Sequence, residues 1–172
     1  NSTLASDEAI SDVSTSDVIS SSVEDTDDTV SSSFEDSDVL SESAVHNVDS
    51  SNYTSYFNKK GNLISPDVKS GDTIRLTGNW NNFNFTLNKT VNVVYDESKP
   101  MKNCVFTLYS GASGSTVTGL KILNTEDYKY GIFLNGVTDC VIKDCFINNT
   151  GQSSYAVCIA NDARYNNITG NF

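Results

Sequence analysis

Apolar and polar residues alternate in short runs along the C-terminal part of the chain, and the runs themselves repeat. The stretch VTGLKILNTEDYKYGIFLNG begins at Val117, and a similar stretch begins 25 residues later at Ile142. A third copy opens with Ile168-Thr169-Gly170 at a shift of 26. The 25-residue shift also aligns Ile122 with Ile147, Asn124 with Asn149, Thr125 with Thr150, Tyr130 with Tyr155, Ile132 with Val157 and Leu134 with Ile159. Self-similarity at this period is typical of a solenoid.

The alternation within each repeat predicts β-strands with one buried face. A repeat of 25 residues is too short for a βαβ unit, which needs about 30 residues or more. It fits about three short strands per turn, each parallel to its equivalent in the next turn at about 4.8 Å. Parallel crossovers are almost always right-handed. The predicted fold is therefore all-β, a right-handed parallel β-helix.

The repeat also predicts which side chains are stacked. We expect the aliphatic residues to form inward-facing columns, which bury apolar area at roughly 25 cal/mol per Å². Asn124 over Asn149 should form a short ladder at a turn, with amides bonded to one another and to turn backbone. Gly119 and Gly170 should permit a tight bend. The predicted columns contain Val117, Leu120 or Cys145, Ile122 and Ile147, Ile132 and Val157, and Leu134 and Ile159.

Upstream of the regular repeats, the strands continue less regularly through DTIRLTG, FNFTLNKTVNVVYD and CVFTLYSGASGSTVTG. Before them, residues 52–70 mix aromatic and turn residues, and we expect a short helix or loop over residues 54–58. A β-helix must cover its first turn, because bare strand edges invite aggregation. Tyr53, Tyr56 and Phe57 are the side chains suited to that cap. The other end stops within a repeat at Phe172, so we expect the N-terminal part of a longer solenoid, with residues 71–172 forming its turns.

Charge separates one segment from the rest of the chain. Residues 1–51 contain 13 of the 22 acidic residues and none of the 11 Lys and Arg, whereas the remainder is nearly neutral. This segment is also rich in Ser and Thr and has only scattered apolar residues. Such a composition cannot bury enough apolar surface to offset the entropy of ordering. We therefore predict a disordered acidic spacer over residues 1–51.

Glycosylation sequons and the absence of long apolar runs bear on the compartment. Sequons of the type N-x-Ser/Thr begin at Asn1, Asn52, Asn84, Asn88, Asn148 and Asn167, and such sites are used in secreted proteins. With the Ser/Thr-rich segment they favour an extracellular, cell-surface protein whose signal peptide has been removed. No apolar run approaches the roughly 20 residues of a membrane helix. Any membrane attachment should therefore reside in parts of the parent protein outside these residues.

The four cysteines are predicted to be buried free thiols. Partners in adjacent turns should lie one period apart, but no pair among Cys104, Cys140, Cys145 and Cys158 is separated by 25 or 26 residues. A ladder of disulfides between turns is therefore disfavoured. The spacing of Cys140 and Cys145 also lacks the tight C-x2-C pair of common zinc sites. We predict no metal site and no cofactor.

The repeats resemble a known family. The segments SGDTIRLTGN, FNFTLNKTVNVV, FTLYSGASGSTVTGLKILN and YGIFLNGVTDCVIKDCFINNTG are together similar to the adhesin-like surface proteins of methanogenic archaea of the gut and mouth, which have a pectate-lyase-like β-helix. The resemblance covers roughly residues 52–172 and excludes the acidic segment. It implies export, display on the cell surface and attachment to other microbes or host glycans. It supplies no catalytic residues.

Catalytic chemistry is poorly represented, although parallel β-helices also include pectate lyases and polygalacturonases and the fold does not decide function. The nearest acidic cluster is Asp139, Asp144 and Asp162, which could in principle form a paired-carboxylate hydrolase, but we favour solvated turn residues. The single histidine, His46, falls in the acidic segment. A nucleophile–histidine system therefore has no base in the predicted folded part. We predict that the protein is not an enzyme.

Aromatic residues form the best candidate binding site. Tyr130 over Tyr155, with Tyr128 nearby, should present neighbouring rings, and Trp80 lies in the loop TGNWNNF. Aromatic rings cover the C–H faces of sugars while asparagine amides bond hydroxyls. Glycans or surface proteins of other cells are the expected partners, and nucleic acid is not, because the acidic segment repels phosphate. The alternatives are a purely structural spacer, in which the tyrosines only cover a face, and a carbohydrate-active enzyme.

Overall fold

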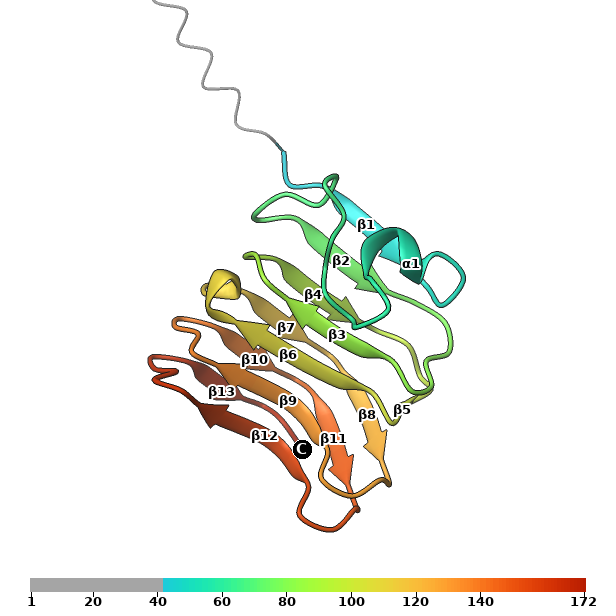
Figure 1. Ribbon diagram of the computed structural model, residues 1–172, viewed down its shortest axis with the longest axis vertical. Coiled ribbons are helices and arrows are strands. Elements are labelled where there is room, and N and C mark those ends of the chain that lie inside the picture. Colours follow the sequence, from blue (N-terminus) through green and yellow to red (C-terminus); the bar gives the residue numbers. More distant parts are fainter. Residues whose placement is uncertain (1–41) are drawn as a thin grey trace, which may run out of the picture. The chain divides into compact units, whose positions relative to one another are not determined.

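The computed structural model describes residues 42–172, which form a stack of parallel β-strands (Figure 1). Every strand pair within residues 42–172 is parallel. The longest sheet contains six strands, one above the other, which corresponds to about five turns. The predicted parallel β-helix is confirmed. Residues 1–41, with the sequon at Asn1, lie outside the described residues.

Three sheets form the sides of the stack. Sheet 1 contains β1 (Val45–Val48), β2 (Thr73–Leu76), β4 (Asn92–Tyr95), β7 (Thr116–Thr118), β10 (Val141–Lys143) and β13 (Asn167–Thr169) in this order. Sheet 2 contains β5 (Met101–Lys102), β8 (Lys121–Asn124) and β11 (Phe146–Asn149). Sheet 3 contains β3 (Asn84–Leu87), β6 (Val105–Tyr109), β9 (Tyr130–Asn135) and β12 (Tyr155–Ala160). The three turns from β4 to β12 each contribute one strand to each side, whereas the turn with β2 and β3 has only an isolated bridge, Asn81 to Lys102, on the sheet 2 side.

The strand register reproduces the alignment deduced from the repeat. Val117 pairs with Ile142, and Ile142 pairs with Ile168 in the next turn. Tyr130 likewise pairs with Tyr155. The third repeat copy is thus in register, and the irregular upstream segments supply the earlier turns, as predicted.

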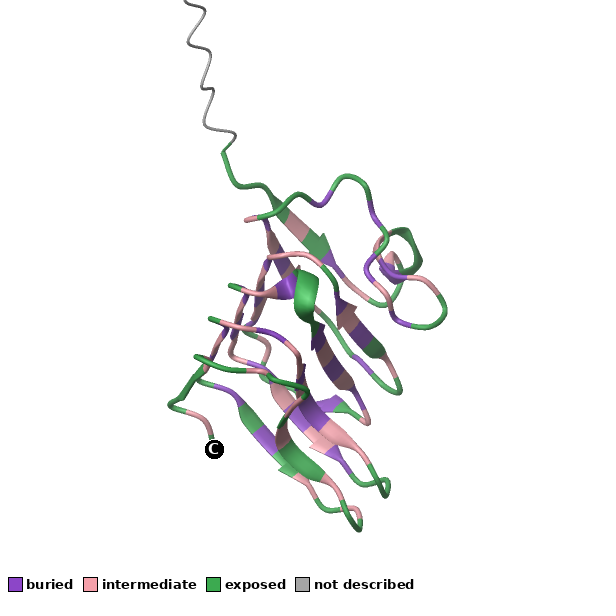
Figure 2. Cartoon of the chain, turned by 60° about the vertical axis from the view of Figure 1, so that its left-hand side comes forward, coloured by how far each residue is buried: buried purple, intermediate pink, exposed green. Residues whose placement is uncertain are grey.

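Inward-facing side chains form the predicted columns. In most strands from β2 to β10, buried residues alternate with exposed or half-buried ones, whereas β12 and β13 of the last turn contain no buried residue (Figure 2). The column that runs through sheet 3 is Phe85, Phe106, Ile132 and Val157, and the next inward column is Leu87, Leu108, Leu134 and Ile159. The column of sheet 2 begins with Met101 and continues through Ile122 to Ile147. The buried members of these columns form one continuous hydrophobic core. In the last turn described, Val157 is only partly buried and Ile159 is 50% exposed, although both continue the columns in register.

The first turn is covered by an aromatic cap, as expected. The short helix α1 (Tyr53–Tyr56) leads into Phe57, and the Tyr53 and Phe57 side chains are buried. The Phe57 ring packs edge-on against Phe85, with 5.4 Å between ring centroids, and Phe85 stacks on Phe106 at 4.5 Å. The Tyr53 hydroxyl donates to the carbonyl of Asn84. Aromatic side chains therefore seal the core at this end.

Strand β1 corrects the boundary of the acidic segment. It lies within residues 1–51, which we had predicted to be disordered, yet it pairs with β2 from Val45 to Val48. His46, which we had placed in the spacer, is part of this strand, and its Nε2 lies 2.8 Å from Asp72 Oδ2. The edge strand was missed because its apolar residues are few and it is stabilised by long-range pairing, which a local pattern does not report.

The asparagine ladder is partly different from the prediction. Asn124 pairs with Asn149, but the amides bond to backbone and not to each other. Asn124 Nδ2 donates to the carbonyls of Cys104 and Tyr130, and Asn149 Nδ2 donates to those of Lys129 and Tyr155. Each amide therefore ties its own turn to the turn before it.

Candidate functional site

An aromatic surface lies on the outer face of sheet 3. The Tyr130 and Tyr155 rings are stacked with 5.9 Å between centroids, and the Tyr130 and Phe133 rings are stacked at 4.9 Å. Tyr155 is 55% exposed, and Tyr128, in the turn before β9, is 73% exposed. We call Tyr128, Tyr130, Phe133 and Tyr155 the tyrosine surface. It confirms the predicted stacking of Tyr130 on Tyr155.

Gly131 explains why two aromatic rings of one strand lie side by side. The residue is buried, and a side chain on it would collide with Ile147 in the core. Gly131 and Ile132 therefore both face inward, and Tyr130 and Phe133 flank them on the outer face. Strict alternation would have placed residues three positions apart, such as Tyr130 and Phe133, on opposite faces of the sheet. A bulkier residue at position 131 would disturb both the core and the surface.

The turn that carries Tyr128 is held by the equivalent turn of the next repeat. The Tyr128 amide donates to the carbonyl of Gln152, and the Gln152 amide donates to Asp127 Oδ1. The Lys129 amide donates to Ser154 Oγ, 3.0 Å away. Tyr128 itself has a positive φ of 57°. These bonds fix the turn, so the exposed ring projects from a braced backbone.

The structure places Trp80 differently from the prediction. Its side chain is only 2% exposed and packs in the aromatic cluster, with 5.1 Å between its ring and that of Phe85. Trp80 lies between β2 and β3, next to the bridge from Asn81 to Lys102, and its side chain points into the core. Interpreting TGNWNNF as a loop could not reveal this orientation. Trp80 therefore cannot serve as a stacking platform for a sugar.

The predicted sequon asparagines differ in accessibility. Asn84, Asn148 and Asn167 are exposed. Asn52 Nδ2 donates to the carbonyl of Asn47, and Asn88 Nδ2 donates to that of Leu63. Glycan attachment at these two positions would break the bond that the amide makes, even though Asn88 is itself exposed. Asn84, Asn148 and Asn167 are therefore the more accessible acceptors.

The acidic residues considered for hydrolysis lie in turns. Asp139, Asp144 and Asp162 have φ of 59°, 54° and 61° and are exposed. Asparagine and aspartate tolerate this left-handed conformation better than other non-glycine residues. Their positions agree with the interpretation as solvated turn residues. Within residues 42–172, no group of three or more His, Cys, Asp or Glu is arranged to hold a metal ion.

His46 lies in the folded part of the chain, beside an aspartate. Asp72 Oδ2 accepts from the Lys69 amide as well as contacting the imidazole, and Asp72 Oδ1 accepts from the Ala44 amide. These bonds lower the pKa of Asp72 to about 2. The histidine ring also packs edge-on against Tyr56, with 5.9 Å between centroids. The pair therefore fastens β1 to the turn before β2.

The sequence analysis missed two features. Phe133 joins the tyrosine surface, and the alternation Ile132, Phe133, Leu134 was the signal that could have placed its ring outside. A hollow on sheet 2 brings together Lys99 and Lys102 of one turn with Asn79 and Asn81 of the previous turn. This hollow had no signal in the sequence, because the turns concerned lie outside the regular repeat.

Comparison of the chain with models of known protein families, with curated protein sequences and with solved structures found no match. The resemblance to adhesin-like proteins therefore stays a prediction. In the part of the chain that the structure describes, no helix is both long and apolar enough to cross a membrane.

Proposed function

We propose that the protein is an extracellular, cell-surface β-helix that binds glycans of other cells, as an adhesin does. The observation that carries this proposal is the stack of the half-buried Tyr130 and the exposed Tyr155 on the outer face of sheet 3, with 5.9 Å between ring centroids. Aromatic rings in fixed positions bind the C–H faces of sugars with little loss of side-chain entropy. Exposed aromatic clusters of this kind are typical of interaction sites.

Two further observations support the proposal. The backbone around the tyrosine surface is braced by hydrogen bonds between successive turns, which favours binding because little ordering is needed. The exposed sequon asparagines Asn84, Asn148 and Asn167 are consistent with an extracellular location. Neither observation requires a catalytic group.

The test is a glycan array with the full chain and the double variant Tyr130→Ala/Tyr155→Ala. The wild-type chain should bind one or more glycans, and the variant should bind at least about tenfold more weakly, because each aromatic contact contributes on the order of 1 kcal/mol. Circular dichroism should show that the variant remains folded, since both rings lie outside the core.

Tyr109→Ala is the matched control. Tyr109 is also an outward tyrosine of sheet 3 and is 46% exposed, but it lies at the other end of its strand. Its removal should leave binding unchanged. Absence of glycan binding by the wild-type chain would favour the structural spacer. Release of reducing ends or unsaturated products from a polysaccharide would favour a carbohydrate-active enzyme.

A further inference from the structure

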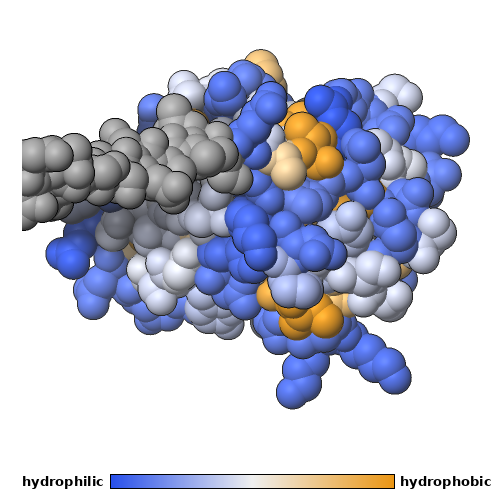
Figure 3. Space-filling model, turned by 90° about the horizontal axis from the view of Figure 1, so that it is seen from above, coloured by the Kyte–Doolittle hydropathy of each residue, from blue (hydrophilic) through white to orange (hydrophobic). Residues whose placement is uncertain are grey.

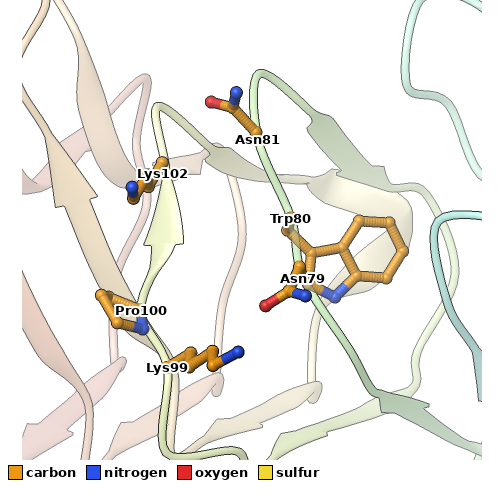
Figure 4. Close-up of a pocket in the computed structure, with 6 residues that line it drawn as sticks. All are labelled: Asn79, Trp80, Asn81, Lys99, Pro100 and Lys102. Atoms are coloured by element: carbon orange, nitrogen blue, oxygen red, sulfur yellow. The ribbon is translucent and has the colours of Figure 1, made fainter.

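A groove on the outer side of sheet 2 is separate from the tyrosine surface. One hollow of about 480 Å³ is lined by Asn79, Trp80, Asn81, Lys99, Pro100 and Lys102 (Figure 4). A second hollow of about 260 Å³ is lined by Asn81, Lys102, Asn103, Leu123 and Thr125. The two hollows are adjacent, because Asn81 and Lys102 line both of them, and we call them together the lysine groove. The larger hollow has the size of a small-ligand site.

Successive turns of the solenoid build the walls of this groove. Asn81 is bridged in parallel to Lys102, and Lys102 pairs with Leu123 of the following turn. The Lys102 amide donates to the carbonyl of Trp80, 2.9 Å away. Trp80 and Met101 face the core. Strand alternation therefore directs the side chains on either side of them outward, so that three turns present a fixed row of groups.

The lysine groove is positively charged although the whole chain has a net charge of −11. None of its lining residues is acidic. The nearby carboxylates are engaged elsewhere: Asp96 pairs with Arg75 at 2.7 Å, and Glu97 Oε1 accepts from the Gly78 amide. Among residues 42–172, no carboxylate lies within 4.0 Å of the ammonium of Lys99 or Lys102. Two lysines that have no counter-ion among the described residues attract an anionic ligand.

Neutral groups of the lysine groove suit the rest of such a ligand. The amides of Asn79 and Asn81 are exposed and can both donate to and accept from hydroxyl groups. Pro100 and Leu123 supply apolar surface. The indole Nε1 of Trp80 is buried and has no hydrogen-bond partner within the described part of the chain. A mixture of cations, amides and apolar walls matches a charged sugar better than a long polyanion such as nucleic acid, which the acidic chain would repel.

We propose that the lysine groove binds an acidic saccharide, with the anionic group at Lys99 and Lys102 and the sugar hydroxyls at Asn79 and Asn81. The inference rests on the proposed function in taking the ligand to be a glycan, but it uses none of the residues of the tyrosine surface. Carboxylate and sulfate share the charge that the lysines recognise, and the experiment below distinguishes them.

The experiment measures binding of the full chain by calorimetry to short dextran oligosaccharides in three forms: unmodified, carboxymethylated and sulfated. At least one of the two acidic forms should bind, and neutral dextran should bind at least tenfold more weakly. The variant Lys99→Ala/Lys102→Ala should lose at least tenfold in affinity for that acidic form. Asn81→Ala should also weaken binding, although it changes no charge.

Lys59→Ala/Lys60→Ala is the matched control, because it removes two exposed lysines of the cap. It should leave the affinity unchanged. If the two double-lysine variants lose affinity equally, the proposal is overturned, because the ligand would then be attracted unspecifically to the positive charge of the chain. Failure of the wild-type chain to bind either acidic form would also overturn it.

The tyrosine variant separates this inference from the proposed function. Tyr130→Ala/Tyr155→Ala should retain binding of the acidic dextran while losing the glycans found on the array. If that variant loses all binding and the Lys99/Lys102 variant loses none, the lysine groove proposal fails and the proposed function stands. If only the lysine variant loses binding, the groove proposal is supported and the tyrosine surface fails as a binding site.

Discussion

The four cysteines illustrate how one residue type takes two environments in this fold. Cys104, Cys140 and Cys145 are buried, as predicted, whereas Cys158 is only half-buried. Cys158 pairs with Phe133 on sheet 3 and so faces outward, beside the tyrosine surface. Burial raises the pKa of the Cys104 and Cys145 thiols to about 11. The core thiols are therefore both inaccessible and protonated at neutral pH.

We expect native thiol labelling to modify Cys158 alone. Maleimide reacts with the thiolate, and both burial and a raised pKa suppress it at the three core positions. Intact mass spectrometry should show one adduct for the folded chain and four after unfolding, since the chain has four cysteines. Cys158→Ser should remove the native adduct. A second adduct on the folded chain would contradict the burial of the other three.

At the scale of elements, the turns between strands limit which residues are tolerated. Gly119, predicted to sit at a tight bend, has φ of 73° between β7 and β8, and a side chain on it would collide with the carbonyl oxygen of Tyr95 in the preceding turn. Gly114 has a similar φ of 77°, but a side chain there would make only an ordinary contact with Thr90. Alanine substitutions at the two positions therefore distinguish the cost of the left-handed backbone conformation from the cost of a steric collision.

Gly119→Ala should therefore destabilise the protein more than Gly114→Ala. The left-handed conformation costs an alanine about 1–2 kcal/mol at either position, and the collision at position 119 adds about 1–3 kcal/mol. Urea unfolding, followed by circular dichroism, measures both free energies. Equal losses in the two variants would show that the backbone of the preceding turn moves away at little cost.

At the scale of the whole molecule, the N-terminal end is the part that closes the stack. Figure 3 looks onto this end and shows a largely hydrophilic surface with small hydrophobic patches. Beneath it, the aromatic cap covers the core, and the buried Asp72 links β1 to β2 through the amides of Ala44 and Lys69 and the ring of His46. Loss of this carboxylate should loosen the edge strand.

The N-terminal end should become less stable at acid pH, because Asp72 is then protonated. The bonds from Lys69, His46 and Ala44 lower its folded-state pKa from the ordinary 3.8 to about 2. The carboxylate therefore stabilises the fold fully above pH 4, and this contribution falls as the pH drops from about 4 to 2. Asp72→Asn should cost about 2 kcal/mol at pH 7, and much less at pH 2.

Urea unfolding at pH 7, 4 and 2.5 measures that difference. Asp67→Asn, which changes an exposed acid of the same loop, should have little effect at any pH. A difference between wild type and Asp72→Asn that stays constant across this range would show that Asp72 is not ionised in the folded protein.

The periodic part of this protein can be deduced from its amino-acid sequence. The 25-residue shift specified the parallel register, the aliphatic columns and the stacking of Tyr130 on Tyr155, because a repeated pattern of apolar residues can be buried only when equivalent strands lie side by side. The aromatic cap was also visible, since a solenoid must cover its first turn.

Only the tertiary structure decided the positions where the repeat is broken or where distant segments meet. Trp80 lies in the core and not in an open loop, β1 joins the sheet through pairing with β2, and Lys99 comes together with Asn79 on neighbouring turns. These outcomes depend on which segments are adjacent in space. Local alternation sets the face of a residue within its strand, but the neighbours in the next turn are set by loop lengths that vary upstream of the regular repeats.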